Sequence, residues 1–202
     1  MDVTNLTADA AVFTANAYLI QGDRTALVDV GAMPGVETAV REHVSALDAV
    51  VLTHRHEDHV AELDAVREAF APTVSAATPG PEGATVLEDG AAVLLGDEPF
   101  EVVATPGHAP DHLAFVGRRA VFTGDLVVYS DGAFADGSFG RTDLAGGDRE
   151  TLVASIDRLL DRLPETVDAL YPGHGPAFHG DVRAVIERAR ERAATGEPKY
   201  SE

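Results

Sequence analysis

Three histidines and an aspartate lie within six residues of one another, in the segment His54-Arg55-His56-Glu57-Asp58-His59. Imidazole and carboxylate groups crowded in this way are ligands that zinc and other divalent transition metals prefer. The chain has no cysteine, so thiolate ligands, disulfides and a cysteine nucleophile are excluded. The segment therefore predicts a metal centre built from nitrogen and oxygen ligands.

The spacing inside this cluster suits a segment that leaves a strand better than a helix. Two ligands on one helix face lie three or four positions apart, whereas alternate residues of an extended segment share a direction. His54 and His56 are two apart, so we expect both to point the same way from an extended or turning segment. Asp58 and His59 are adjacent and should diverge, which indicates a second metal or a different role.

Three more candidate ligands each follow an apolar run that ends in glycine. His108 follows Thr105-Pro106-Gly107, Asp125 follows Phe122-Thr123-Gly124, and His174 follows Tyr171-Pro172-Gly173. Glycine lets the backbone turn sharply and approach a neighbour closely, so each side chain can point into a shared pocket. The pattern predicts that these three residues join the histidine cluster.

The elements expected to position these residues alternate between strands and helices. We expect strands at 17–20, 25–30, 48–53, 73–76, 92–95, 100–105, 113–116, 120–123 and 169–171, and helices over 34–44, 60–70, 148–163 and 182–189. The stretch 130–147 is rich in Gly, Asp and Ser and is predicted to be an ordered loop. With no internal repeat and no domain boundary, residues 1–202 are predicted to form one α/β domain.

The charge balance is strongly acidic, with 34 acidic and 15 basic residues and a formal net charge of −19. Lys199 is the only lysine. The acidic residues are spread along the chain, which favours a halophilic protein hydrated in molar salt over an acidic module that binds a basic partner. Because such a surface repels a polyanion, no nucleic-acid substrate is expected.

The chain shows neither a signal-peptide pattern at its N-terminus nor a run of roughly 18 consecutive apolar residues. We therefore expect a cytoplasmic protein that does not bind membranes. Its expected partner is a small-molecule substrate, and its expected state is a monomer or a homodimer.

Five segments combine the candidate ligands with glycine, proline or threonine. They are THRHEDH at 53–59, TPGH at 105–108, FTGD at 122–125, GRTDLAGGD at 140–148 and YPGHGP at 171–176. Together they resemble the motifs of the metallo-β-lactamase superfamily, and within it the glyoxalase II-like (hydroxyacylglutathione hydrolase-like) branch. The resemblance implies an αββα sandwich, two mixed β-sheets flanked by helices. It also implies that this chain lacks the branch's C-terminal helical glutathione-binding domain, because too few residues follow His174.

The resemblance assigns the seven candidate ligands to two metals. By this assignment His54, His56 and His108 bind one ion, Asp58, His59 and His174 bind the other, and Asp125 bridges both. Two zinc ions suit such a ligand set, which also tolerates iron or manganese. Asp58 is in addition the expected catalytic residue, because it can orient the nucleophile or carry its proton.

The activity that the resemblance implies is hydrolysis of an S-2-hydroxyacyl thioester, such as an S-lactoyl thiol, by a metal-bound hydroxide. Arg141, Tyr129 and Phe139 are candidates for substrate binding, with Arg141 suited to a substrate carboxylate. Asp29 and His112 are expected to orient the ligands from behind.

Other functions stay open on the sequence alone. A persulfide dioxygenase on the same fold would use a single iron held by His54, His108 and Asp125. A hydrolase of another bond, in a lactone, a β-lactam or RNA, would keep the metal centre, although the acidic charge argues against RNA. A non-catalytic binding protein would lack some of the ligands, and all seven are present.

Overall fold

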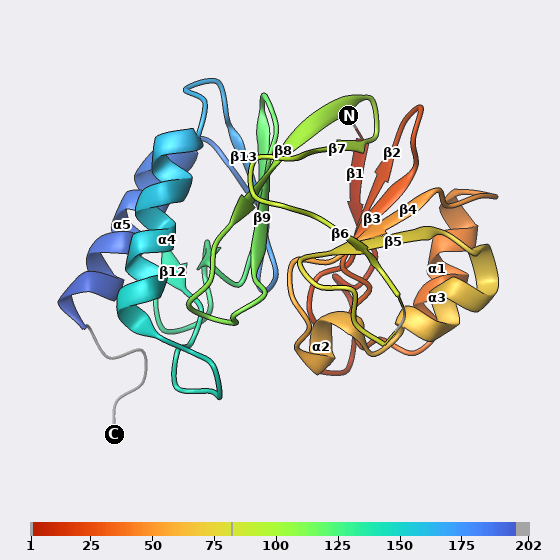
Figure 1. The fold of residues 1–202 in the computed structure, drawn as a ribbon, viewed down its shortest axis with the longest axis horizontal. Helices are drawn as coiled ribbons and strands as arrows, with labels where there is room; N and C mark the ends of the chain where they lie inside the picture. Colours follow the sequence, from red (N-terminus) through yellow and green to blue (C-terminus); the bar gives the residue numbers. More distant parts are fainter. Residues whose placement is uncertain (1, 82, 197–202) are drawn as a thin grey trace.

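The computed structural model describes residues 2–81 and 83–196, in which two six-stranded sheets face each other (Figure 1). The first sheet contains, in chain order, β1 (Asp2–Asn5), β2 (Tyr18–Gln21), β3 (Ala26–Val28), β4 (Ala49–Val51), β5 (Thr73–Ala76) and β6 (Thr85–Val86). The pairs β1/β2 and β2/β3 are antiparallel, and the pairs from β3 to β6 are parallel. This sheet is therefore mixed.

The second sheet has the strand order β14-β13-β10-β9-β8-β7. Its strands are β7 (Ala92–Leu95), β8 (Glu98–Ala104), β9 (Leu113–Val116), β10 (Ala120–Gly124), β13 (Ala169–Pro172) and β14 (Phe178–His179). Only β10 and β13 pair in parallel, so this sheet is also mixed. A separate pair joins β11 (Val127–Val128) to β12 (Ser138–Phe139), which lies inside the stretch predicted to be a loop.

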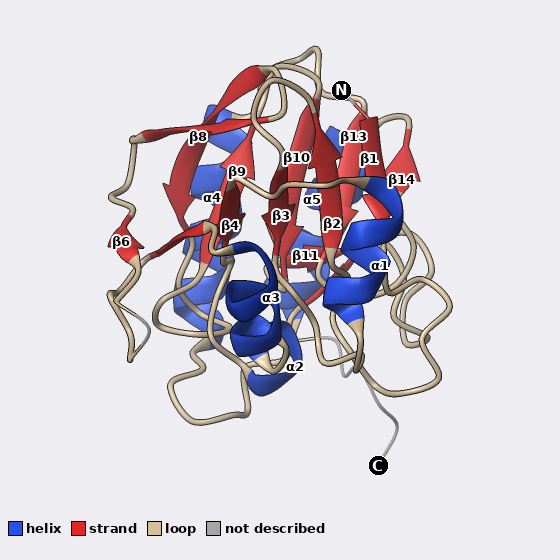
Figure 2. Ribbon diagram, turned by 90° about the vertical axis from the view of Figure 1, so that its right-hand side faces the viewer, coloured by secondary structure: helices blue, strands red, loops and turns tan. Residues whose placement is uncertain are grey.

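Helices cover the outer face of each sheet. Helices α1 (Val36–His43) and α3 (Leu63–Phe70) cover the first sheet, and α4 (Arg149–Arg162) and α5 (Val182–Thr195) cover the second (Figures 1 and 2). The short helix α2 (Glu57–Val60) lies near the lower edge of the sandwich in Figure 1. Two mixed sheets between helical layers confirm the predicted αββα sandwich.

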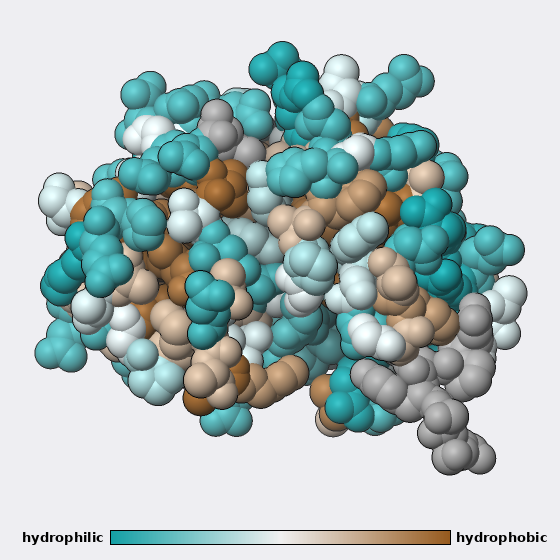
Figure 3. All heavy atoms as spheres, turned by 180° about the vertical axis from the view of Figure 1, so that it is seen from behind, coloured by the Kyte–Doolittle hydropathy of each residue, from teal (hydrophilic) through white to brown (hydrophobic). Residues whose placement is uncertain are grey.

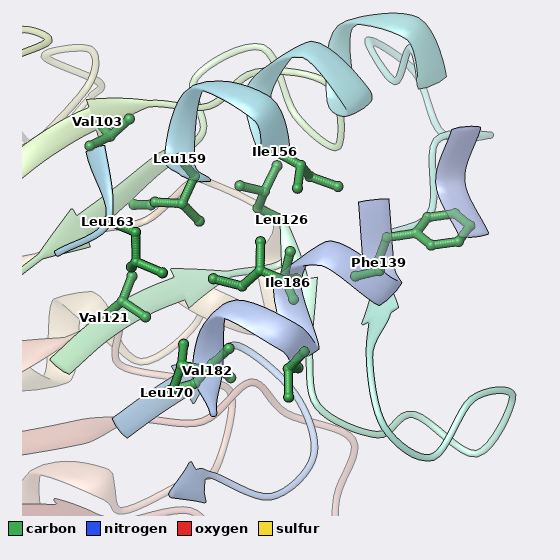
Figure 4. Close-up of a cluster of buried hydrophobic side chains, with 14 of the residues drawn as sticks. Val103, Val121, Leu126, Phe139, Ile156, Leu159, Leu163, Leu170, Val182 and Ile186 are labelled. Carbon is green, nitrogen blue, oxygen red and sulfur yellow. The ribbon is translucent and has the colours of Figure 1, made fainter. Parts of the chain in front are cut away.

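The core has three apolar layers, one between the sheets and one under each helical layer. Phe100, Phe115 and Phe122 fill the space between the sheets. The predicted amphipathic helix α4 starts at Asp148, whose side chain accepts a hydrogen bond from the Thr151 N–H and so caps the helix. Its apolar face packs with α5 against the second sheet (Figure 4).

Leu159→Ala is expected to lower the free energy of unfolding by about 2–5 kcal/mol. Leu159 is fully buried between α4 and the second sheet, so truncation leaves a cavity that rigid neighbours cannot fill. Denaturant unfolding of the two proteins measures the difference. Leu94→Ala is the matched control, because Leu94 is 40% exposed, and it should change the value by only about 0.5 kcal/mol. Equal effects of the two substitutions would contradict this packing.

Among the residues that the structure describes, no helix combines the length and the apolar character needed to cross a membrane. On the face shown in Figure 3, hydrophilic side chains predominate and apolar ones form small patches between them. This distribution agrees with the acidic, polar composition of the chain.

Candidate metal centre

The predicted ligands lie at the carboxyl ends of strands, at one edge of the sandwich. The histidine cluster follows β4, His108 follows β8, Asp125 follows β10 and His174 follows β13. Strands β10 and β13 are parallel, and β8 runs in the same direction as β10 because β9 is antiparallel to both. The second sheet therefore presents its three ligands at the same edge.

The structure brings all seven predicted ligands together. They form three overlapping groups whose ligand atoms lie within 4.8 Å of one another: His54, His56 and His108; His54, His59 and Asp125; Asp58, His59 and His174. The adjacent residues Asp58 and His59 fall into one group, although the spacing predicts that they diverge. They lie on helix α2 rather than on an extended segment, and the helical turn allows both to reach His174.

Hydrogen bonds behind two of the histidines fix which ring nitrogen faces the centre. His59 Nδ1 donates to Asp29 Oδ2 over 2.7 Å, as expected for the predicted orienting role of Asp29. Thr53 Oγ1 also donates to Asp29 Oδ2, so it accepts from His54 Nδ1 over 3.1 Å. Burial lowers the pKa of His54 well below its usual value, so that ring is neutral. Nε2 of both rings therefore faces the centre.

The group formed by His54, His56 and His108 has more hydrogen-bond acceptors than hydrogens. His108 Nδ1 donates to the Arg141 carbonyl over 2.7 Å, so its Nε2 carries a lone pair. That Nε2 lies 2.9 Å from His56 Nδ1, which is itself 3.0 Å from His54 Nε2. One hydrogen on His56 cannot satisfy both neighbours, whereas a shared cation binds all three nitrogens.

The electrostatics of the centre also fit a divalent cation. His59 Nε2 and Asp125 Oδ1 are buried and have no hydrogen-bond partner among the described residues. Burial opposes charge on His59, yet the carboxylates of Asp125 and Asp29 raise the pKa of His59 well above its usual value. Burial likewise opposes charge on Asp125, yet His59 and neighbouring imidazoles hold the pKa of Asp125 well below its usual value. The centre thus stabilises positive charge beside an ionised carboxylate. A bound divalent metal would supply that positive charge.

His112 lies directly behind the centre and contacts Asp125 through the backbone. Its Nε2 accepts a hydrogen bond from the Asp125 N–H over 3.0 Å, and its Nδ1 donates to Thr105 Oγ1 over 2.8 Å. Burial lowers the pKa of His112 to about 3, so the ring stays neutral and can accept. The structure therefore places His112 where it positions Asp125, outside the three ligand groups.

The predicted substrate contacts lie in different surroundings. Arg141 and Phe139 line a cavity of about 1100 Å³ that opens over the centre. Arg141 forms two hydrogen bonds with Asp143, of 2.8 and 2.6 Å. Tyr129 stacks on Phe178 with ring centroids 4.5 Å apart and packs against the core under α4 and α5, outside the cavity lining. Substrate binding by these three residues stays a prediction.

The sequence did not indicate the segment Ala15–Asn16, which links two of the ligand loops. Asn16 donates to three carbonyls of the segment 172–175, one through its backbone N–H over 2.7 Å and two through Nδ2 over 2.8 and 2.9 Å. The Ala15 N–H donates to the Asp58 carbonyl over 3.0 Å. These two residues thus hold Asp58 and His174 in place, and His174 Nε2 lies 3.0 Å from Asp58 Oδ2.

Asn16→Ala is expected to weaken metal binding at Asp58, His59 and His174 by about 10–100-fold and to spare His54, His56 and His108. The substitution removes both Nδ2 donors from the segment that carries His174. Metal analysis after dialysis against graded chelator concentrations measures how many ions each variant retains.

Asn5→Ala provides the control for that experiment. Asn5 Nδ2 donates to Asn16 Oδ1 over 2.9 Å, so its loss removes one bond to Asn16 and leaves both of the Nδ2 donors in place. The control should retain the metal content of the unmodified protein. Equal metal affinities of the Asn16→Ala variant and the unmodified protein would show that Asn16 does not hold the His174 loop.

Comparison with known proteins agrees with this geometry. The family model described as the metallo-beta-lactamase superfamily matches residues 10–174. The probable metallo-hydrolase YqgX of Bacillus subtilis is 33% identical, over 80% of this chain and 85% of its own. A hydroxyacylglutathione hydrolase of Vibrio cholerae is 34% identical over 78% of this chain. The match spans only 60% of that relative's length.

Two solved structures also superpose on most of the chain. ETHE1 from Myxococcus xanthus has a TM-score of 0.76 and 27% sequence identity, and covers 98% of this chain and 87% of its own. TTHA1623, solved in a di-iron-bound form, has a TM-score of 0.73 and 30% identity, and covers 94% of this chain and 98% of its own.

Proposed function

The chain belongs to the metallo-beta-lactamase superfamily, and on that premise we propose that it hydrolyses S-2-hydroxyacyl thioesters, such as S-lactoyl thiols, with two zinc ions. The observation that carries the proposal is the convergence of seven candidate ligands around two buried atoms that form no hydrogen bond with any residue the structure describes, His59 Nε2 and Asp125 Oδ1. The 34% identity to the Vibrio cholerae hydroxyacylglutathione hydrolase supports the choice of bond.

The candidate ligands would hold the two ions, and Asp58 would also take part in proton transfer. His54, His56 and His108 would hold one ion, Asp58, His59 and His174 the other, and Asp125 both. When bound, the ions lower the pKa of water toward neutrality and polarise the thioester carbonyl. Asp58 lines the cavity, where its carboxylate can accept the proton of the attacking water.

Thioesterase assays test the proposal. S-lactoyl conjugates of glutathione, γ-glutamylcysteine and coenzyme A would be supplied to the zinc-loaded protein in molar KCl, which suits its acidic surface. We expect turnover of at least one conjugate and its loss in a His56→Ala variant, because His56 lies within 3.0 Å of two other ligand nitrogens. A folded, metal-loaded protein that hydrolyses none of the three would refute the proposal.

The second candidate function is that of a persulfide dioxygenase with one iron held by His54, His108 and Asp125. The TM-score of 0.76 to ETHE1 favours it as the alternative. Because TTHA1623 binds two irons, iron content alone does not separate the two functions. Oxygen consumption with a persulfide substrate does separate them, since hydrolysis consumes no oxygen.

A further inference from the structure

Exposed apolar side chains gather around the cavity over the metal centre. In the part of the chain that the structure describes, five large hydrophobic residues are exposed, and three of them line this cavity: Val12, Phe13 and Leu144. Phe13 is 80% exposed. Apolar groups that converge on one cavity while exposed to water mark a surface that binds an apolar ligand.

The apolar surface adjoins the reacting centre. Val12 and Phe13 come from the loop between β1 and β2, and Leu144 comes from the loop that precedes α4. The Phe13 ring stacks on the imidazole of His174, with centroids 5.2 Å apart and planes 16° apart. Because His174 is one of the candidate ligands, Phe13 directly contacts the edge of the metal centre. If the thioester carbonyl lies at the metal centre, the acyl group is therefore closer to Phe13 than the distant parts of the thiol carrier are.

The charged residues of the cavity offer little to an anionic substrate group. Among the described residues that line the cavity, Arg141 is the only arginine, and there is no lysine. Its guanidinium donates two hydrogen bonds to the Asp143 carboxylate. Apart from the ligands, the other charged lining residues are Glu57 and Asp131, which are acidic. Recognition at this wall therefore depends on apolar contact rather than on ion pairing.

We propose, on the basis of the hydrolase activity proposed above, that the site selects thioesters whose acyl group carries an aromatic or branched apolar side chain. This side chain packs on Phe13 and against Leu144 while the carbonyl faces the ligands. The pocket discriminates such an acyl group from a lactoyl group by about 10–100-fold, the range typical of an apolar pocket that gains a larger apolar group.

Two substrates with the same thiol test the selection. S-mandeloylglutathione and S-lactoylglutathione differ only by a phenyl in place of a methyl group on the acyl chain. We expect kcat/KM to favour the mandeloyl substrate by about 10-fold or more. Phe13→Ala should bring the ratio close to 1. Val86→Ala should leave it unchanged, because Val86 is an exposed apolar residue outside the cavity lining. Equal kcat/KM values in the unmodified protein, or an unchanged ratio in Phe13→Ala, would overturn the proposal.

A binding measurement separates this proposal from the proposed activity. Calorimetry with the zinc-loaded protein compares mandelate with lactate, the acids released by the two substrates. Mandelate should bind about 10-fold more tightly, and Phe13→Ala should remove the difference. If neither thioester is hydrolysed, the proposed activity fails and calorimetry still decides the selection. Equal affinities for the two acids would overturn the selection even where hydrolysis occurs.

Discussion

Asp125→Asn is expected to lower kcat/KM for thioester hydrolysis by about 10³-fold, which corresponds to about 4 kcal/mol of transition-state stabilisation. Asp125 contacts both halves of the centre. Its Oδ1 lies 3.4 Å from His59 Nε2, and its Oδ2 lies 3.4 Å from His108 Nε2 and 3.5 Å from His174 Nε2. The amide keeps the shape of the side chain but removes the negative charge that two cations would share, so both ions should bind more weakly.

Metal content and steady-state kinetics check this expectation together. Metal analysis should show fewer ions per chain in Asp125→Asn than in the unmodified protein after the same dialysis. Asp64→Asn makes the same chemical change on a side chain that is 95% exposed, and it should leave both metal content and kcat/KM within about two-fold. A fully active Asp125→Asn variant with its metal content unchanged would remove Asp125 from the centre.

Much of the fold follows from local apolar patterns. Strands β5, β7 and β9 coincide with the predicted ranges 73–76, 92–95 and 113–116. Strands β7 and β9 are short apolar runs between polar or turn residues. Strand β1, with the sequence DVTN, was not predicted, since it is short and mostly polar and exists through its pairing with β2. Strand β12 was missed for the same reason, because its partner β11 defines it.

The clustering of the seven candidate ligands could be predicted from sequence, because candidate ligands are marked by residue type and by position after a strand. The supporting contacts could not. Asn16 reaches the Pro172 carbonyl across 156 positions of the chain, and Phe13 stacks on His174 from an equally distant loop. In one sequence, Asn16 and Phe13 look like ordinary loop residues. Tyr129, in contrast, lies near Asp125 in sequence but packs into the core on Phe178. Residue type and position after a strand therefore indicate the candidate ligands, whereas proximity along the chain does not indicate which residues line the cavity.

Gly173→Ala is expected to abolish metal binding at the His174 side and to destabilise the fold by about 1–3 kcal/mol. The Gly173 N–H donates to the Gly124 carbonyl over 2.8 Å, and its own carbonyl accepts from the Asn16 N–H over 2.7 Å, so the backbone is held on both sides. A Cβ here would overlap Asp125 Oδ1 and come within 2.8 Å of His59 Cε1. The methyl group would thus occupy the space in which two ligands meet.

Comparison with Gly90→Ala separates this overlap from the ordinary cost of replacing a glycine. Gly90 has φ +79°, and a Cβ there has no heavy atom within 4 Å, so alanine should cost about 1–2 kcal/mol of backbone strain and leave the metals bound. Gly173 is not among the positive-φ glycines, so its cost comes from contact rather than from strain. Denaturant unfolding and metal analysis of both variants test the distinction. Asp125 and His59 would have to move apart to admit the methyl group that Gly173→Ala introduces. Retention of the metals by Gly173→Ala, as expected for Gly90→Ala, would therefore contradict the close packing of these two ligands around Gly173.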